Sequence, residues 1–217
     1  MRAKKVFVYG ASGHGRVVGD ILQARKDANF IGYIDDAADL LGRKVLGFPV
    51  FGNGEWLHQE ATKMELAVAL GIADNIIRQR LARQCTAWGI ELVTLVHPTA
   101  SVSSSAKLGY GVVVMAQAAI NAEAKIGDGA IVNTSAVVEH DVQIGDFAHV
   151  SPGVVMAGAT RLGKLSHLGI GALVIPCVSV GAKTVVGAGS VVVRNIPDDV
   201  IAYGVPARVQ RAFEAGR

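Results

Sequence analysis

The sequence contains little charge and almost no cysteine. Only 18% of its 217 residues are charged, the formal net charge is +3, and no run of Lys or Arg extends beyond a pair. We therefore expect no nucleic-acid partner, because nucleic-acid-binding surfaces need clustered positive charge. The two cysteines, Cys85 and Cys177, are too few for a disulfide framework, and their spacing resembles no zinc motif.

The sequence also lacks a long apolar run at its N-terminus. Basic residues precede the apolar stretch 6–9, but Gly10 ends that stretch after a few residues. It is too short for a signal peptide or a membrane-spanning helix. The hydrophobic fraction of 51% argues against disorder. We expect a soluble, cytoplasmic protein with no membrane partner.

Residues 1–95 alternate between apolar strands and amphipathic helices. The composition and periodicity predict strands at 6–9, 30–34, 47–50, 66–70 and 90–96, and helices at 16–25 and 74–88. Strands separated by helices favour a parallel sheet. We therefore predict a small, Rossmann-like α/β domain over residues 1–95.

A six-residue repeat begins at Val96. Every sixth residue from Val96 to Val192, 17 positions in all, is a large aliphatic residue or Met, and the residue two places earlier is Ala, Val, Ser or Thr. Such a period builds a parallel β-helix, in which three hexads close a triangular coil of 18 residues. Glycines recur at that spacing, at Gly109, Gly127, Gly145, Gly163 and Gly181. We predict a β-helix over residues 96–197 and a C-terminal tail over 198–217.

The segment Gly10-Ala-Ser-Gly-His-Gly15 lies between a predicted strand and a predicted helix. Turns of this kind let the backbone approach a phosphate, with free N–H groups at the helix N-terminus. Its spacing is not that of the G-x-G-x-x-G dinucleotide fingerprint. A tight turn without a ligand remains the alternative.

Taken together, the sequence resembles the hexapeptide-repeat acyltransferases, and more narrowly the sugar acetyltransferases that carry a small nucleotide-binding domain before the β-helix. These include bacterial enzymes that acetylate nucleotide-linked 4-amino-4,6-dideoxy sugars, and the sialic acid O-acetyltransferases. The resemblance covers nearly the whole chain. Its motifs are Gly10–Gly15, Ile34-Asp-Asp36, Asn133-Thr134, Glu139-His140-Asp141, Ile144-Gly-Asp146, His149 and Gly204-Val-Pro-Ala-Arg208.

The resemblance implies a left-handed β-helix and an acetyl-CoA-dependent N-acetyltransferase. Its acceptor would be the C4 amine of a nucleotide-linked amino-dideoxy sugar, in the synthesis of a bacterial surface glycan such as lipopolysaccharide O-antigen. UDP, dTDP and GDP all remain open as the nucleotide. O-acetylation of a sialic acid or related sugar is the alternative within the enzyme class. A structural module that uses the β-helix only to trimerise is the alternative outside it.

The N-terminal candidates for substrate binding follow the predicted strands. By resemblance, Ser12, Gly13 and His14 contact the nucleotide sugar near its diphosphate. Asp35 and Asp36 end a strand, where carboxylates can accept hydrogen bonds from ribose hydroxyls or a base; a solvated turn is the alternative. Gly71, at the end of another strand, could let the ligand approach the backbone.

The catalytic candidates lie on the β-helix. His140 is flanked by Glu139 and Asp141 and matches the general base of the family, although the family member compared has Glu at the position of Asp141. A neighbouring carboxylate orients an imidazole and raises its basicity. Gly158 lies one 18-residue coil beyond His140, so its N–H is a candidate oxyanion donor. A surface histidine and a tight corner are the alternatives for His140 and Gly158.

His149 and His167 are 18 residues apart and should therefore stack on one wall. The γ-class carbonic anhydrases bind zinc with three histidines on this fold, but His140 occupies a different hexad position, so we expect no metal. By resemblance, His149, Ile170 and Ala188 contact acetyl-CoA. His167 is assigned with them by its stacking alone.

The tail and the outer walls suggest two further contacts. By resemblance, the C-terminal tail closes over the cofactor with the loop at residues 204–208. Arg208 in this loop could bind a CoA phosphate, or be a solvated charge. The outward positions include Val113, Val137 and Val155, which suggests that a partner covers a wall. We expect a homotrimer, and the resemblance implies that acetyl-CoA lies in the groove between two β-helices.

Overall fold

The computed structural model describes residues 4–213 and divides into two compact units between Pro98 and Thr99. We call them the N-terminal unit and the β-helix unit. Residues 1–3 of the predicted N-terminal domain and residues 214–217 of the predicted tail lie outside the described residues.

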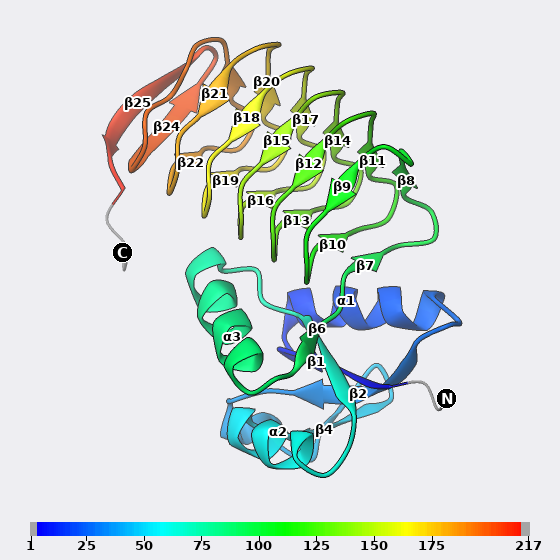
Figure 1. The fold of residues 1–217 in the computed structure, drawn as a ribbon. Helices are drawn as coiled ribbons and strands as arrows, with labels where there is room; N and C mark the ends of the chain where they lie inside the picture. Colours follow the sequence, from blue (N-terminus) through cyan, green and yellow to red (C-terminus); the bar gives the residue numbers. More distant parts are fainter. Residues whose placement is uncertain (1–3, 214–217) are drawn as a thin grey trace. The chain divides into compact units, whose positions relative to one another are not determined.

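The N-terminal unit is built on a six-stranded sheet with the order β3-β4-β2-β1-β5-β6 (Figure 1). The strands are β1 Lys5–Tyr9, β2 Asn29–Ile34, β3 Lys44–Val45, β4 Phe48–Gly52, β5 Leu66–Leu70 and β6 Glu91–Leu92. All neighbours are parallel except β3 and β4. The central strands β1 and β5 are almost fully buried, as the continuous apolar runs predict. The predicted parallel α/β sheet is confirmed.

The helices of this unit are α1 Gly13–Ala24, α2 Gly54–Ala61 and α3 Asn75–Ala87, with a short 3-10 helix η1 at Ala38–Leu40. Helix α1 begins earlier than predicted, directly after Ser12. Helix α2 was not predicted, because only two of its eight residues are buried and its apolar face is weak. The predicted strand 90–96 is broken into β6 and β7 Leu95–Val96.

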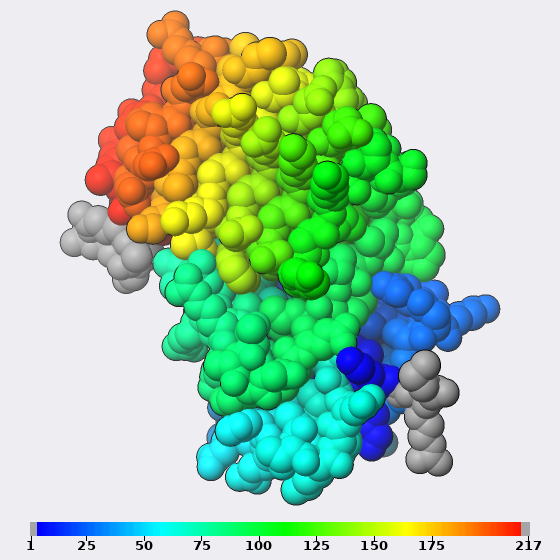
Figure 2. All heavy atoms as spheres, in the orientation of Figure 1, coloured from blue at the N-terminus to red at the C-terminus, as the bar shows by residue number. Residues whose placement is uncertain are grey.

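The β-helix unit has three walls of short parallel strands, stacked one coil on the next (Figure 1). In the space-filling view, successive coils follow one another in chain order from green to orange (Figure 2). The first wall contains β10 Val113–Val114, β13 Ile131–Val132, β16 His149–Val150, β19 His167–Leu168 and β22 Val185–Val186. The second contains β8 Ser101–Val102, β11 Ala119–Ile120, β14 Val137–Val138, β17 Val155–Met156, β20 Leu173–Val174 and β23 Val191–Val192. The third contains β9 Lys107–Leu108, β12 Lys125–Ile126, β15 Gln143–Ile144, β18 Arg161–Leu162 and β21 Ser179–Val180.

The six-residue repeat explains the interior of these coils. From Val114 to Val192 every sixth residue is at most 3% exposed, and strands 18 residues apart pair in register, as His149 does with His167. Burying one such aliphatic side chain contributes about 1.5–3 kcal/mol. The predicted β-helix and its 18-residue coil are confirmed.

The corners follow the same period through the backbone. From residue 111 to residue 189, every sixth residue has a positive φ, and it is not always glycine: Asp141 has a φ of 60° and Cys177 a φ of 61°. Asp and Asn tolerate this conformation better than most side chains. The carboxylate beside His140 is therefore attached to a corner whose backbone suits it.

The predicted tail contains two strands, where we expected a loop that closes over the cofactor. Strands β24 Val200–Gly204 and β25 Ala207–Ala212 form an antiparallel hairpin, and β24 pairs with β22 of the first wall. Ala202 and Ala207 are buried within this hairpin. Across residues 4–213, no helix is both long enough and apolar enough to cross a membrane.

Candidate active site

His140 lies on the corner that follows β14, with its side chain 62% exposed. Its Nδ1 lies 2.9 Å from Oδ2 of Asp141. A carboxylate accepts hydrogen bonds, so the Nδ1–H donates and Nε2 is left as the basic nitrogen. The geometry singles out Asp141 rather than Glu139 as the residue that orients the ring.

Gly158 lies directly against the ring of His140. A Cβ atom placed on Gly158 would be 2.6 Å from both Cε1 and Nε2 of His140, closer than van der Waals contact allows. The backbone of this corner is also tied to the next coil, because Ala159 N–H donates to the carbonyl of His140 at 2.9 Å. Glycine is therefore required at 158 for the imidazole to occupy this position.

The N–H of Gly158 is suited to bind an anion. At the equivalent hexad position on another corner, Tyr110 N–H donates to Asp128 Oδ1 at 2.9 Å and Ala182 N–H donates to Asp198 Oδ1 at 2.7 Å. Within the described chain, no protein acceptor is recorded for the Gly158 N–H. The residue one coil further is Pro176, which carries no carboxylate. The role of the Gly158 N–H as an oxyanion donor beside His140 stays a prediction.

The first wall carries the predicted histidine pair. The rings of His149 and His167 are stacked, with centroids 4.7 Å apart and an interplanar angle of 7°. Nδ2 of Asn133 lies 3.0 Å from Nε2 of His149, and Oγ of Ser151 lies 2.7 Å from Nε2 of His167. Sequence reasoning assigned no role to Asn133 or Ser151, although each lies 16 residues before its histidine.

The corner after this wall presents apolar side chains. Ile170 is 62% exposed and Ala188, one coil further, is also exposed. A Cβ atom on Gly187 would lie 2.7 Å from Cβ of Tyr203, so the hairpin packs beside this corner. The hairpin adds exposed Tyr203 and Val205, which sequence reasoning missed. Arg208 is exposed, and its Nη1 donates to the carbonyl of Ala207 at 3.0 Å.

In the N-terminal unit, the predicted ligand turn lies at the switch point of the sheet. After β1 the chain builds β2 and β4 on one side of the sheet and then returns to β5 on the other side of β1. Open α/β sheets bind ligands at such a point, beyond the carboxyl ends of the strands. Ser12 and Gly13 are exposed there, Ser12 makes no capping bond, and a Cβ atom on Gly13 would meet nothing within 4 Å.

Asp35 and Asp36 connect the loops around this point. Asp35 accepts hydrogen bonds from Ala11 N–H at 2.8 Å and from Ala37 N–H at 2.9 Å. Asp36 accepts from Tyr9 Oη–H at 3.0 Å and from Gly54 N–H at 3.0 Å. Both carboxylates therefore shape the edge of the sheet. Both oxygens of Asp35 and Oδ2 of Asp36 keep a second lone pair, and contact with a substrate stays a prediction.

His14 and Gly71 line the same edge. Burial, followed by the positive charge of Arg78, lowers the pKa of His14 to about 4, so the ring is neutral at physiological pH and would meet a phosphate as a hydrogen-bonding group. A Cβ atom on Gly71 would lie 2.7 Å from Val8 Cγ1 and 2.9 Å from the carbonyl oxygen of Gly10. Close packing thus explains glycine at 71, and its ligand contact stays a prediction.

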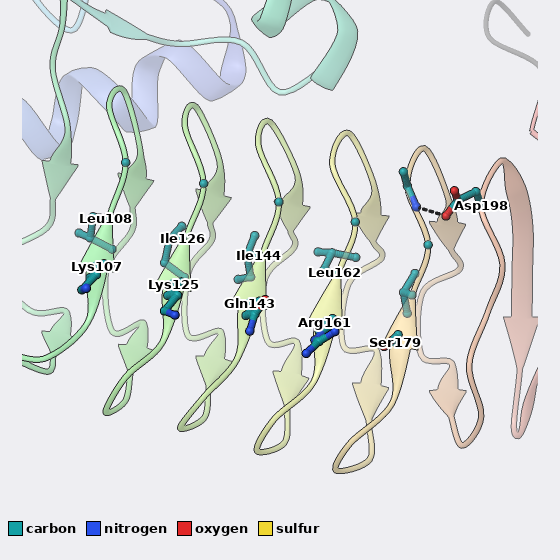
Figure 3. Close-up of a pocket in the computed structure, with 17 residues that line it drawn as sticks. Lys107, Leu108, Lys125, Ile126, Gln143, Ile144, Arg161, Leu162, Ser179 and Asp198 are labelled. Carbon is teal, nitrogen blue, oxygen red and sulfur yellow. Dashed lines mark hydrogen bonds between the residues drawn. The ribbon is translucent and has the colours of Figure 1, made fainter.

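A groove of about 690 Å³ runs along the third wall of the β-helix (Figure 3). One side chain from each successive strand projects along it, in the order Lys107, Lys125, Gln143, Arg161 and Ser179. None of the predicted site residues lines this groove. Across residues 4–213, no group of three or more His, Cys, Asp or Glu side chains is arranged to hold a metal ion.

Two protein families match separate parts of the chain. Residues 5–85 match the PglD N-terminal domain, and residues 123–158 match the bacterial transferase hexapeptide of six repeats. A solved structure extends the similarity over both units. It is a mutant of perosamine N-acetyltransferase from Caulobacter crescentus in complex with CoA and GDP-perosamine, 44% identical, covering 95% of this chain and 96% of that chain with a TM-score of 0.91. This chain belongs to the PglD-like hexapeptide-repeat sugar N-acetyltransferases.

Other members of the family match this chain over its whole length or over about half of it. The acetyltransferase domain of PglB from Neisseria gonorrhoeae, in complex with acetyl coenzyme A, is 36% identical and covers 96% of this chain and 100% of that chain, with a TM-score of 0.90. UDP-N-acetylbacillosamine N-acetyltransferase of Bacillus subtilis is 39% identical over 122 residues, 52% of each chain. The chain thus spans about half the length of the curated relatives it matches.

Family membership confirms the main sequence predictions. The fold is an α/β unit followed by a left-handed β-helix, and the family is the predicted one of sugar N-acetyltransferases.

Proposed function

We propose that this protein transfers the acetyl group of acetyl-CoA to the C4 amine of a nucleotide-linked 4-amino-dideoxy sugar, in the cytoplasmic synthesis of a bacterial surface glycan. GDP-perosamine is the first candidate acceptor. The observation that carries the proposal is the His140–Asp141 pair, with the His140 ring packed against Gly158, on a chain 44% identical to an enzyme bound to GDP-perosamine.

His140 acts as the general base. The lone pair of the sugar amine attacks the thioester carbonyl carbon, and Nε2 of His140 accepts the proton that the nitrogen loses as the new C–N bond forms. Asp141 holds the ring through Nδ1 and stabilises the imidazolium that results. No covalent acyl-enzyme is required, so Cys177 has no assigned part.

Gly158 stabilises the oxyanion. The carbonyl oxygen becomes negative in the tetrahedral intermediate, and a positioned backbone N–H lowers its energy. The intermediate then collapses with cleavage of the C–S bond, and CoA leaves as a thiolate. On another corner of the same β-helix, the equivalent N–H groups of Tyr110 and Ala182 bind carboxylate oxygens, which supports the assignment.

The two units divide the substrates between them. The N-terminal unit binds the nucleotide and diphosphate through the N-terminus of α1, with Ser12, Gly13 and neutral His14 nearest the phosphates. Asp35, Asp36 and Gly71 complete that edge. The β-helix unit binds acetyl-CoA along the first wall and its corner, through His149, His167, Ile170, Ala188 and Arg208.

A homotrimer completes the acetyl-CoA site in this proposal. Val155 and Leu173 are paired neighbours on the second wall and are 36% and 44% exposed, whereas Val113 is buried within the chain itself. An apolar wall of this kind suits a second copy of the β-helix. Light scattering should give about three times 22.6 kDa, and Leu173→Glu should lower both that mass and the activity. A fully active monomer would contradict this arrangement.

The direct test is a kinetic panel. Acetyl transfer is measured through the CoA thiol that it releases. The acceptors compared are GDP-perosamine, a UDP-linked 4-amino sugar, a dTDP-linked 4-amino sugar and a free sialic acid. We expect the highest kcat/KM with GDP-perosamine. The similarity to the UDP-N-acetylbacillosamine enzyme makes the UDP-linked sugar the second candidate. Turnover of sialic acid alone would replace N-acetylation by O-acetylation.

A further inference from the structure

Arg78 is the buried charge of the N-terminal unit. It lies on the first turns of α3, where its backbone N–H donates to the carbonyl of Asp74 at 2.9 Å, and its side chain is 0% exposed. Arg80 and Arg83, on the same helix, are both exposed. Burying a guanidinium costs several kcal/mol unless its donors are satisfied, so its contacts should explain why it is there.

Those contacts go to the loop that joins β5 to α3. Nη1 of Arg78 donates to the carbonyl oxygens of Ile72 at 3.1 Å and Ala73 at 2.9 Å, and Nη2 donates to Oδ1 of Asn75 at 2.8 Å. The planar fork of a guanidinium fixes three acceptors at once, which a lysine ammonium cannot do with the same rigidity. Arg78 thereby holds the shape of residues 72–75.

This loop packs against the glycine turn after β1. A Cβ atom on Gly10 would lie 2.6 Å from the carbonyl oxygen of Gly71 and 2.7 Å from Cδ1 of Ile72. Gly71 N–H also donates to the carbonyl of Tyr9 at 2.8 Å. The two loops that meet at the switch point therefore support each other, and a change in one displaces the other.

The positive charge of Arg78 also acts on His14, on the other side of the switch point. Burial lowers the pKa of its guanidinium to about 9, which still leaves it positive at neutral pH. That charge contributes to the low pKa of His14 in the first turn of α1. The positive end of α1 and the guanidinium thus act on one region.

We propose that Arg78 is a positioning residue for the nucleotide-linked sugar: it holds residues 72–75 against the glycine turn and places a fixed positive charge behind the region where the diphosphate binds. The proposal rests on the function proposed above. Arg78 itself is buried, so it acts through the loop and through its field rather than by touching the substrate. Sequence reasoning assigned it no role, because an arginine on a helix looks like a solvated charge.

Two substitutions separate these contributions. Arg78→Met removes the charge and the fork, and we expect the KM for GDP-perosamine to rise about tenfold or more, the scale of lost hydrogen bonds to a charged group. Arg78→Lys keeps the charge and should restore part of that loss. The KM for acetyl-CoA should stay within about twofold in both, since uniform loss of sugar binding leaves the other substrate unaffected. Arg80→Met, an exposed change on the same helix, is the control.

A milder variant and a spectroscopic measurement test the proposal even if Arg78→Met fails to fold. Asn75→Ala removes one acceptor of the fork and should raise the same KM by a smaller factor. In an NMR titration of the free enzyme, the pKa of His14 should rise in Arg78→Met and stay unchanged in Arg78→Lys and Arg80→Met. A purely structural role would not separate these variants by charge.

Several results would overturn the proposal. An unchanged KM for the nucleotide sugar in both Arg78→Lys and Asn75→Ala would do so, as would equal rises of the two KM values. If the wild type acetylates none of the sugars tested, the proposed function fails instead, and calorimetric binding of GDP and UDP to wild type, Arg78→Lys and Asn75→Ala replaces the kinetics. Equal nucleotide affinities there, or no binding to wild type, would count against Arg78.

Discussion

The two units of this protein obey different rules. In the β-helix unit, a residue's position within its hexad decides whether it faces the core, the solvent or a corner, and the same hydrogen bonds recur every 18 residues. In the N-terminal unit no such period exists, and each loop at the carboxyl edge of the sheet has its own contacts. In the β-helix unit, the differences between corners therefore indicate the candidate site. In the N-terminal unit, the loops that meet at the carboxyl edge of the sheet indicate it.

The corners of the β-helix differ in the groups that lie beside their N–H groups. On one corner, carboxylates one coil further accept the N–H groups of Tyr110 and Ala182. At the corner of Gly158 the residue one coil further is Pro176, which has no carboxylate, and the ring of His140 lies beside the glycine. The candidate base thus lies at a corner where the protein supplies no carboxylate to the glycine N–H.

The largest expected effect is in the β-helix unit. His140→Asn removes the base while keeping a side chain of similar shape, and kcat should fall at least about a hundredfold, the usual scale for this loss. Binding of acetyl-CoA, measured by calorimetry, should be nearly intact. A mutant that keeps more than about a third of wild-type turnover would break the assignment of the chemistry to this unit.

Gly158→Ala tests the same corner by shape alone. The new Cβ would lie 2.6 Å from the His140 ring, so the ring must move, and a displacement on the ångström scale should lower kcat about 30-fold. Gly158 is not among the residues with a positive φ, so the melting temperature should change little. Full activity with alanine at 158 would show that the ring position does not matter.

The N-terminal unit should respond through substrate affinity rather than turnover. Gly13→Leu places a side chain in the open space at the N-terminus of α1, and we expect the KM for the nucleotide sugar to rise about tenfold with the KM for acetyl-CoA unchanged. Val17→Leu, an exposed change one turn further along α1, serves as the control. If both KM values rose together, the division of substrates between the units would be lost.

The smallest effect concerns the stability of the N-terminal unit. Unfolded histidine has a pKa near 6.5, while His14 in the folded unit has a pKa lowered to about 4 by burial and Arg78. Between these values the unfolded chain binds more protons, so the free energy of unfolding should decrease as the pH falls from 6.5 towards 4. We expect about 1–2 kcal/mol for this partly buried group, allowing for solvent screening.

Tryptophan fluorescence can measure this change, because Trp56 and Trp88 both belong to the N-terminal unit. Urea denaturation at several pH values would be compared between wild type and His14→Gln. The wild type should lose more stability on acidification than the variant. Parallel curves would mean that His14 titrates normally in the folded protein.

Sequence reasoning went furthest where the structure repeats. The coil, its buried positions, the stacking of His149 on His167 and the place of Gly158 beside His140 all follow from counting in steps of six and 18. It went less far in the N-terminal unit. Helix α2 has too weak an apolar face to be recognised, and the carboxylates of Asp35 and Asp36 bond to neighbouring loops as no local pattern could indicate.

The sequence by itself determined the two-part architecture, because a strict hexad repeat and an alternation of apolar strands and helices each allow one economical way to bury their side chains. It also indicated the candidate base, since His140 is flanked by two carboxylates and matches the general base of the family that the chain resembles. Only the tertiary structure decided that Asp141 orients His140, that Asn133 and Ser151 meet the histidine pair, and that Arg78 holds the loop at the switch point. These contacts depend on side-chain directions and on loops brought together from distant strands, which the spacing of residues along the chain does not encode.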